Sequence, residues 1–336
     1  MIDKILSKLP PRGTPQYVRT KRITLFVAAI LLLGLPWVVT NKYYIHILIS
    51  VGLYSILALS LNLVTGYAGQ LSFCHVAFYG IGAYTGGLLM LRLGVSFWLA
   101  ILAGALMAAF FGLILGLPTL RLRGDYLAIV TLGFGEIVRL VLINSTELTR
   151  GPLGLPGIPS PNLFGYQFSG RVPYYYLILV FLLLTLFLMR RITNSGIGLS
   201  MLAVKHDEIA AESIGIAPIK YKLLAFVLSA AFAGAVGVFY ASYVSFISPD
   251  TFVYTDSVTI LAMVVLGGMA SLPGAVLGAL VLSAVPEILR AINDYRMVLY
   301  GLLMVLMMIY RPQGFWGMQR RLKNAYKYSV GGKDHA

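Results

Sequence analysis

The chain has 336 residues, of which 59% are hydrophobic and only 11% are charged, and its formal net charge is +14. Because a soluble domain carries about 25% charged residues, this composition excludes a sizeable soluble domain and indicates a polytopic membrane protein. The single cysteine, Cys74, excludes a disulfide within the chain and a cysteine metal cluster.

Apolar segments follow one another along most of the sequence, which predicts an all-α membrane fold. A basic leader occupies residues 1–22, a membrane domain residues 23–312 and a basic tail residues 313–336. About ten membrane segments are expected, at residues 23–40, 45–64, 73–91, 97–117, 126–143, 173–189, 223–246, 258–266, 275–288 and 297–310. Segment 258–266 is too short to cross a hydrocarbon core of about 30 Å, so it either begins earlier or turns back within the membrane.

The distribution of Lys and Arg predicts the orientation. With the N-terminus inside, most basic residues lie in cytoplasmic segments, namely the leader, the turn at Arg121 and Arg123, the central loop and the tail. Both termini and the central loop are therefore expected in the cytoplasm. The positive charge then reports topology and an affinity for anionic lipid, and nucleic-acid binding is not expected.

The central loop, residues 203–216, is the main soluble element between two apolar halves. Its sequence, AVKHDEIAAESIGI, predicts one short helix that starts at a capping Asp207 and ends at a left-handed Gly215. One face is expected to carry charges and the other small apolar side chains: Lys205, Glu208 and Glu212, against Ala210, Ala211 and Ile214. A docking element and an ordinary interfacial helix both fit this pattern.

Two glycine-rich stretches interrupt the apolar helices at corresponding places in the two halves. They are residues 66–72 (GYAGQLS) and residues 267–274 (GGMASLPG). Paired interruptions point to a substrate path in transporters built from repeats, whereas glycines also allow close helix contact or a surface turn. These alternatives stay open for the candidate path residues Gly66, Gly69, Gln70, Ser72, His75, Gly267 and Gly268.

Polar residues inside apolar segments are costly and therefore informative. Glu136 and Arg139 lie three residues apart on one helical face, where they form either a structural ion pair, which is favoured, or part of a path or gate. His75 has no His, Cys or carboxylate beside it at metal-ligand spacing, so hydrogen-bonded packing is favoured over a metal site or a proton relay.

Motifs for catalysis are missing from the sequence. There is no phosphate-binding GxxxxGK[ST] loop, no GxSxG elbow and no HExxH pair. The chain is therefore not expected to hydrolyse ATP, to be an enzyme or to hold a metal or cofactor, and its energy must come from a partner or an ion gradient.

Residues 207–216, with the pattern DExAAExxGI, resemble the cytoplasmic coupling loop of ABC-importer permeases, in particular that of branched-chain amino-acid importers. The match continues in YKLLAFVLS at residues 221–229, in GYAGQLS at residues 66–72, in RLRGDY at residues 121–126 and in the glycine pair at 267–268. It covers roughly residues 45–312.

The resemblance implies a bacterial inner-membrane permease for branched-chain amino acids that works by alternating access. It implies a second similar permease, two ATPase subunits and an extracytoplasmic binding protein, which the outer loops at residues 144–172 and 246–257 would receive. It also implies that one ATPase binds the coupling residues Asp207, Glu208, Ala210, Ala211, Glu212 and Gly215.

Three other functions remain open. The nearest is the same kind of permease for urea or short amides, for which the sequence offers no discriminating pocket. An ion-coupled secondary transporter would need membrane carboxylates, of which only Glu136 is well placed. A membrane-embedded enzyme is disfavoured because the nucleophile and metal motifs are missing.

Overall fold

The computed structural model describes residues 41–288 apart from residues 120, 121, 123 and 164, together with residues 34, 36, 37, 301 and 305. Contacts divide the chain into Met1–His46 and Ile47–Ala336, and the fold below is that of the second unit. The first predicted membrane segment lies almost entirely outside the described residues, as does the last. The basic leader and tail lie wholly outside them.

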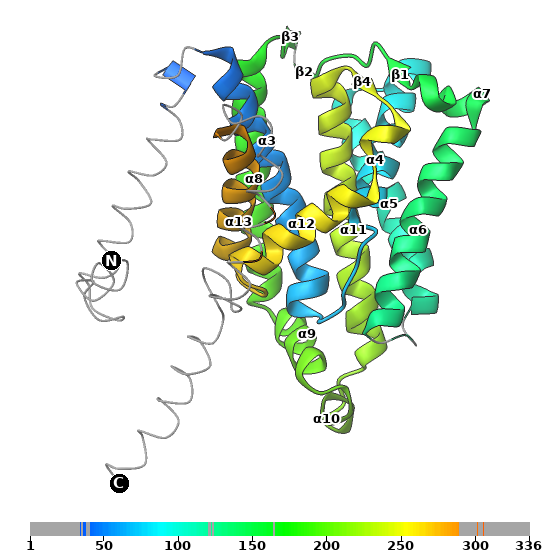
Figure 1. The fold of residues 1–336 in the computed structure, drawn as a ribbon, viewed down its shortest axis with the longest axis vertical. Helices are drawn as coiled ribbons and strands as arrows, with labels where there is room; N and C mark the ends of the chain where they lie inside the picture. Colours follow the sequence, from blue (N-terminus) through cyan, green and yellow to red (C-terminus); the bar gives the residue numbers. More distant parts are fainter. Residues whose placement is uncertain are drawn as a thin grey trace. The chain divides into compact units, whose positions relative to one another are not determined.

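Helices dominate the described residues, as the composition predicts, and Figure 1 shows their arrangement. The helices are α3 (Lys42–Leu61), the π-helix η1 (Asn62–Tyr67), α4 (His75–Leu93), α5 (Phe97–Thr119), α6 (Asp125–Asn144), α7 (Thr146–Thr149), the 3₁₀ turn η2 (Gly151–Leu153), α8 (Arg171–Thr193), α9 (Gly196–His206), α10 (Glu208–Ser213), α11 (Pro218–Val244), the 3₁₀ turn η3 (Pro249–Thr251), α12 (Tyr254–Gly267) and α13 (Leu272–Ile288). Among the described residues, seven helices are long and apolar enough to cross a membrane, and Leu272–Ala284 is a shorter apolar helix.

The centre of the unit is the packing of α4, α5 and α11, which make the most extensive interhelical contacts. Glycines at the crossing points allow these helices to approach closely. A Cβ atom on Gly82 of α4 would overlap the backbone of Gly234 on α11, and one on Gly234 would lie 2.6 Å from the carbonyl oxygen of Gly104 on α5. Small residues are the usual means of close helix packing in membranes, because lipid supplies no hydrophobic force between helices.

Helix α12 begins earlier than the apolar pattern of residues 258–266 alone indicates. It starts at Tyr254, and its first turns carry polar residues that the apolar pattern leaves out. One of them, Ser257, is buried and its Oγ accepts a hydrogen bond from the backbone N–H of Val76 at 3.1 Å. The start of α4 therefore satisfies a polar group that would otherwise be costly in this place.

The two ends of the bundle differ in structure (Figure 1). At one end the chain forms α9 and α10. At the other end the glycine- and proline-rich loop contains α7, η2 and three two-residue strands: β1 (Leu155–Pro156), β2 (Asn162–Leu163) and β3 (Tyr166–Gln167). Strand β1 pairs antiparallel with β4 (Phe246–Ile247), with Leu155 opposite Ile247, and β2 pairs with β3. The β1–β4 pair joins the two predicted outer loops into one surface.

Candidate coupling and translocation site

The central loop forms two helices: α10 is the predicted helix between Asp207 and Gly215, whereas Lys205, expected on its charged face, belongs to α9. Helix α9 ends at His206, and Asp207 adopts an extended conformation with φ −156° and ψ 112°. The Asp207 carboxylate accepts hydrogen bonds from the backbone N–H groups of Ile209 and Ala210 at 2.9 and 3.1 Å, which caps α10 as predicted. Because the cap starts a new helix, Lys205 does not share a face with Glu208 and Glu212.

Helix α10 is fixed to the bundle at its first residue and ends as the sequence predicts. Glu208 forms an ion pair with Lys222 of α11, whose side chain is buried. Gly215 has φ +84°, and the N–H of Ile216 donates to the carbonyl of Ala211 at 3.0 Å. The loop is therefore held in a defined conformation.

The surface of α10 is more apolar than the sequence pattern indicates. Of the three residues assigned to the apolar face, Ala211 is buried, whereas Ala210 and Ile214 are exposed. Ile209 and Ile214 are 76% and 72% exposed, and Glu212 is exposed beside them. The tip formed by α10 therefore exposes two large apolar side chains beside a carboxylate.

Lys205 connects α9 to the first glycine stretch. Its Nζ donates a hydrogen bond to the carbonyl oxygen of Gly66 at 2.6 Å, and its stem covers Gly69, where an added Cβ would lie 2.8 Å from Lys205 Cγ. Burial lowers the pKa of the Lys205 ammonium from its ordinary value. The ammonium meets the C-terminal carbonyls of the helix formed by α3 and η1, where a cation is favoured by the helix dipole.

Asn62 connects the first glycine stretch to the second. It is fully buried, its Oδ1 accepts from the N–H of Ala270 at 2.8 Å, and its Nδ2 donates to the carbonyl of Ser271 at 3.3 Å. Gly66 lies between them, because an added Cβ would overlap Asn62 Oδ1 and approach Ala270 N to 2.5 Å. A single amide, whose hydrogen bond joins residues 208 positions apart in sequence, therefore brings the two stretches together.

Gly267 and Gly268 lie at the end of α12 in the second stretch. Both are buried, and Gly268 has φ +108°, which favours glycine. A Cβ on Gly267 would overlap the backbone of Gly274 at the start of α13. These glycines thus allow a close crossing of α12 and α13, which is one of the two roles that the sequence left open.

The polar residues after the first glycine stretch have different surroundings. His75 is buried and its Nε2 lies 2.7 Å from Ser60 Oγ, and Ser72 Oγ lies 3.2 Å from Cys74 Sγ. Gln70 is only 4% exposed, and neither amide atom has a hydrogen-bond partner among the described residues. No group of three His, Cys, Asp or Glu that could hold a metal occurs in the part of the chain that the structure describes. His75 has the geometry of a packing residue, whereas the Gln70 amide requires a further partner.

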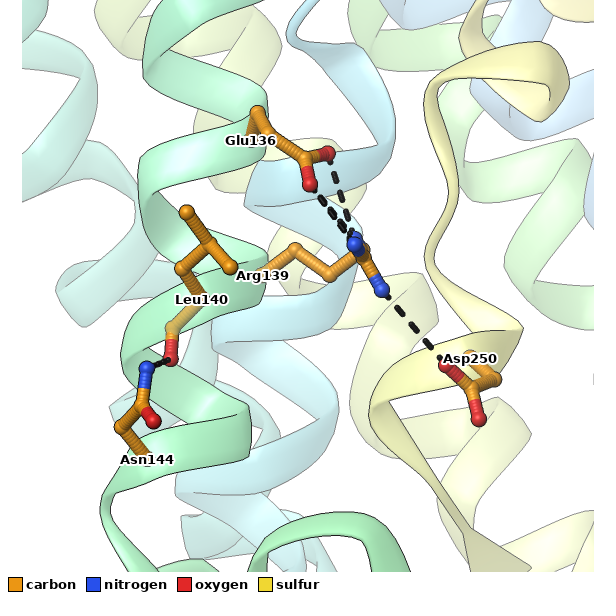
Figure 2. Close-up of polar contacts among 5 residues, drawn as sticks. All are labelled: Glu136, Arg139, Leu140, Asn144 and Asp250. Carbon is orange, nitrogen blue, oxygen red and sulfur yellow. Dashed lines mark hydrogen bonds and ion pairs between the residues drawn. The ribbon is translucent and has the colours of Figure 1, made fainter.

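Glu136 and Arg139 form the ion pair that their spacing predicts, and Figure 2 shows it on α6. Arg139 Nη2 donates to Glu136 Oε1 at 2.7 Å, and Arg139 Nε lies 3.0 and 3.1 Å from the two carboxylate oxygens. A third member comes from η3, because Arg139 Nη1 lies 3.5 Å from Asp250 Oδ1. The side chains of Arg139, Glu136 and Asp250 are 24%, 39% and 73% exposed.

Sequence reasoning missed three residues that make the contacts described above: Asn62, Lys222 and Asp250. Asn62 carries a usable signal, because an amide within the apolar segment 45–64 is costly unless it is paired. Lys222 and Asp250 carry none, because each lies in a different helix from its partner and helical spacing does not relate the two.

Comparisons with known proteins agree with the resemblance. A family model described as "Branched-chain amino acid transport system / permease component" matches residues 43–308. The high-affinity branched-chain amino acid transport system permease protein LivM of Escherichia coli (strain K12) is 43% identical over 332 residues, which is 91% of this chain and 78% of that protein. A probable LivM of Methanocaldococcus jannaschii is 26% identical over 320 residues, 80% of this chain and 91% of that protein.

The LivH permease of Escherichia coli (strain K12) is 25% identical over 288 residues, which is 79% of this chain and 91% of that protein. No solved structure matches the chain. The family model covers most of the described bundle, including the central loop and both glycine stretches. The chain therefore belongs to the family of permease components of branched-chain amino acid transport systems, and it is an inner-membrane transport subunit of an ABC importer and not an enzyme.

Proposed function

We propose that this permease carries branched-chain amino acids between itself and a second, similar permease. Two ATPase subunits drive it, one of them docked on residues 203–216, and an extracytoplasmic protein delivers the substrate. The observation that carries this proposal is the tip formed by α10, which exposes Ile209 and Ile214 beside Glu212 outside the membrane-length helices. Apolar side chains gathered at an exposed, rigidly held helix are typical of a protein contact.

The path runs past the two glycine stretches. This placement is supported by their direct contact through Asn62 and by the buried Gln70 amide, which lacks a partner among the described residues. Irregular backbone and unpaired polar groups are tolerated at membrane depth where a water-filled cavity or another protein satisfies them. Gly69 contributes to the wall beside the Lys205 stem, as do Ser72 and the neighbouring backbone at Gly267 and Gly268. The buried His75 supports this wall from behind.

The Glu136–Arg139–Asp250 cluster faces the second permease. Its support is the partial exposure of charged groups on a membrane-length helix, since charge is strongly disfavoured against lipid. Helix α6 also exposes many of its apolar residues, which a second permease would cover. The pair is structural within α6, and its contact with Asp250 closes the outer part of the path.

The α9–α10 end is cytoplasmic, together with both termini, and the β1–β4 end is extracytoplasmic. The Lys and Arg distribution supports this orientation. In intact cells, in a variant lacking Cys74, a cysteine at the exposed Ser213 is expected to be shielded from an impermeant thiol reagent and one at the exposed Ser169 to react. The reverse pattern would invert the orientation and exclude ATPase docking on α10.

Docking is tested by changing the conformation at the end of α10 without adding a clash. Nothing lies within 4 Å of a Cβ built on Gly215 or on Gly196, but only Gly215 has a positive φ. Gly215→Val is therefore expected to strain the loop, whereas Gly196→Val, at the start of α9, serves as the matched control. In purified assemblies in liposomes, Gly215→Val should lose bound ATPase or lose the response of ATP turnover to the loaded binding protein. Normal ATPase content, turnover and uptake in Gly215→Val would refute docking at this loop.

The substrate is tested separately from the coupling. Uptake of labelled leucine into cells that express the complete importer should be competed by isoleucine and valine and not by urea or acetamide. Competition by urea with no competition by valine would assign the same machine to urea or short amides.

A further inference from the structure

Both helices that meet at Asp207 contact α11, and α9 also contacts η1. Helix α10 is anchored to α11 through the Glu208–Lys222 ion pair. Helix α9 contacts η1, and its Lys205 ammonium reaches the Gly66 carbonyl across 139 residues of sequence. The extended Asp207 joins the two helices, which also contact each other directly, so a displacement of α10 moves α9.

A continuous series of short contacts leads from Lys205 to both glycine stretches. The ammonium binds the Gly66 carbonyl at 2.6 Å, and Gly66 packs against the side chain of Asn62. Asn62 holds the backbone of Ala270 and Ser271 in the second stretch. Each of these contacts involves backbone or a buried amide, which leaves little room for independent movement.

The chemistry of the contact requires a cation on a long, unbranched stem. The stem fits over Gly69, where any larger residue would collide with it, and the charge binds a carbonyl at the C-terminal end of a helix. A neutral side chain of the same length keeps the packing and loses the charged hydrogen bond.

We propose that Lys205 is a positioning residue that transmits movement of the ATPase-bound α10 to the two glycine stretches of the path. This inference rests on the proposed function and adds to it a residue outside the resembling coupling motif. Loss of the ammonium uncouples ATP hydrolysis from transport while the ATPase stays bound, because the ammonium contacts Gly66 of the bundle and the coupling residues between 207 and 215 are unchanged.

The test compares Lys205→Met with Lys220→Met, the same substitution at an exposed lysine in the first turn of α11. Full assemblies are purified and reconstituted in liposomes with binding protein and leucine. ATPase content, the stimulation of ATP turnover by the loaded binding protein and the leucine carried per ATP are measured. Lys205→Met should keep its ATPase subunits and lose leucine transport per ATP at least about five-fold, as coupling between sites commonly amounts to. Lys205→Arg, which keeps a cationic donor, should restore most of this ratio, and Lys220→Met should leave it unchanged.

These measurements distinguish a role of Lys205 in transmitting movement from a role in stability alone. They also distinguish failure of this role from failure of the proposed function. A structural role alone would lower the amount of assembly and leave the leucine carried per ATP unchanged, which would overturn the inference. If the unaltered assembly itself binds no ATPase or shows no ATP-driven leucine uptake, the proposed function fails first. If the unaltered assembly transports normally and Lys205→Met carries the same amount of leucine per ATP, only the role proposed for Lys205 fails.

Hydrogen exchange on the unaltered assembly keeps the inference testable if Lys205→Met does not fold. ATP binding is expected to change amide exchange in residues 66–72 together with residues 203–216. A change confined to residues 203–216 would show that movement of the loop does not reach the glycine stretch.

Discussion

Lys205 and Arg139 each join two elements of the bundle, the first near α10 and the second near the β1–β4 surface. The Lys205 ammonium lies 2.6 Å from a backbone carbonyl and is partly buried, and the contact continues into the buried Asn62 amide. Arg139 lies 3.5 Å from Asp250, whose side chain is 73% exposed.

The difference has an energetic consequence. A hydrogen bond to a charged group that is shielded from water contributes about 1.5–3 kcal/mol, whereas an exposed ion pair contributes about 0–1 kcal/mol. The contact between Lys205 and Gly66 is therefore expected to persist while the helices move during transport. The weaker contact between Arg139 and Asp250 is expected to open and close. The four substitutions below test this contrast, beginning with the largest expected effect.

Gly66→Ala should be the most damaging change, because the added Cβ would meet Asn62 Oδ1 and the backbone of Ala270. Overpacking of this kind typically costs about 1–3 kcal/mol, and the backbone here cannot rotate away as a side chain would. We expect a large loss of monodisperse permease after extraction in detergent. Gly133→Ala on α6 is the control, since nothing lies within 4 Å of its Cβ. Equal yields for the two variants would show that the Gly66 contact is not tight.

Asn62→Leu removes both hydrogen bonds between the glycine stretches. It leaves the buried Ala270 N–H and Ser271 carbonyl without the hydrogen bonds that Asn62 makes. Leaving a buried polar group unsatisfied costs about 1–3 kcal/mol of stability. The thermal unfolding midpoint in detergent should fall clearly. Asn144→Leu, the same change at the exposed end of α6, should alter it little. A matching shift in both variants would contradict a bridging role for Asn62.

Arg139→Met leaves the Glu136 carboxylate without its partner on a membrane-length helix. The expected loss is about 1 kcal/mol, below that of a fully buried pair because both side chains are partly exposed. The double variant Glu136→Met with Arg139→Met should recover part of the folded protein, since a lone charge costs more than none. If Glu136→Gln assembles normally but abolishes uptake, the ion pair acts mainly in transport and a purely structural role is wrong.

Asp250→Asn should have the smallest effect on stability, below about 0.5 kcal/mol, because the pair is long and exposed. The unfolding midpoint is expected to stay constant while uptake changes, if the contact opens and closes during transport. Asp125→Asn, at the exposed start of α6, is the control and should change neither quantity. A drop in stability as large as that of Asn62→Leu would remove the contrast between the two contacts.

The caps at residues 207 and 215 were predictable because they are local. A carboxylate that can accept from the next N–H groups, and a glycine at a left-handed position, need only neighbouring residues. The same local reasoning placed the apolar helices between residues 45 and 288 and the pairing of Glu136 with Arg139, which one helical turn brings together. It erred in placing Lys205 on the charged face of α10, because Lys205 precedes the cap and belongs to α9.

Sequence alone determined the class of this protein, because apolar segments of membrane length and the motif at residues 207–216 are properties of the chain itself. Tertiary structure decided which polar groups meet. Lys205 reaches Gly66, and Asn62 holds residues 270 and 271, only because helices distant in sequence pack together. Lys222 pairs with Glu208 because the start of α11 packs against α10. No periodicity encodes such contacts, since each depends on how deeply two helices approach, and the glycines that permit the approach do not specify their partner.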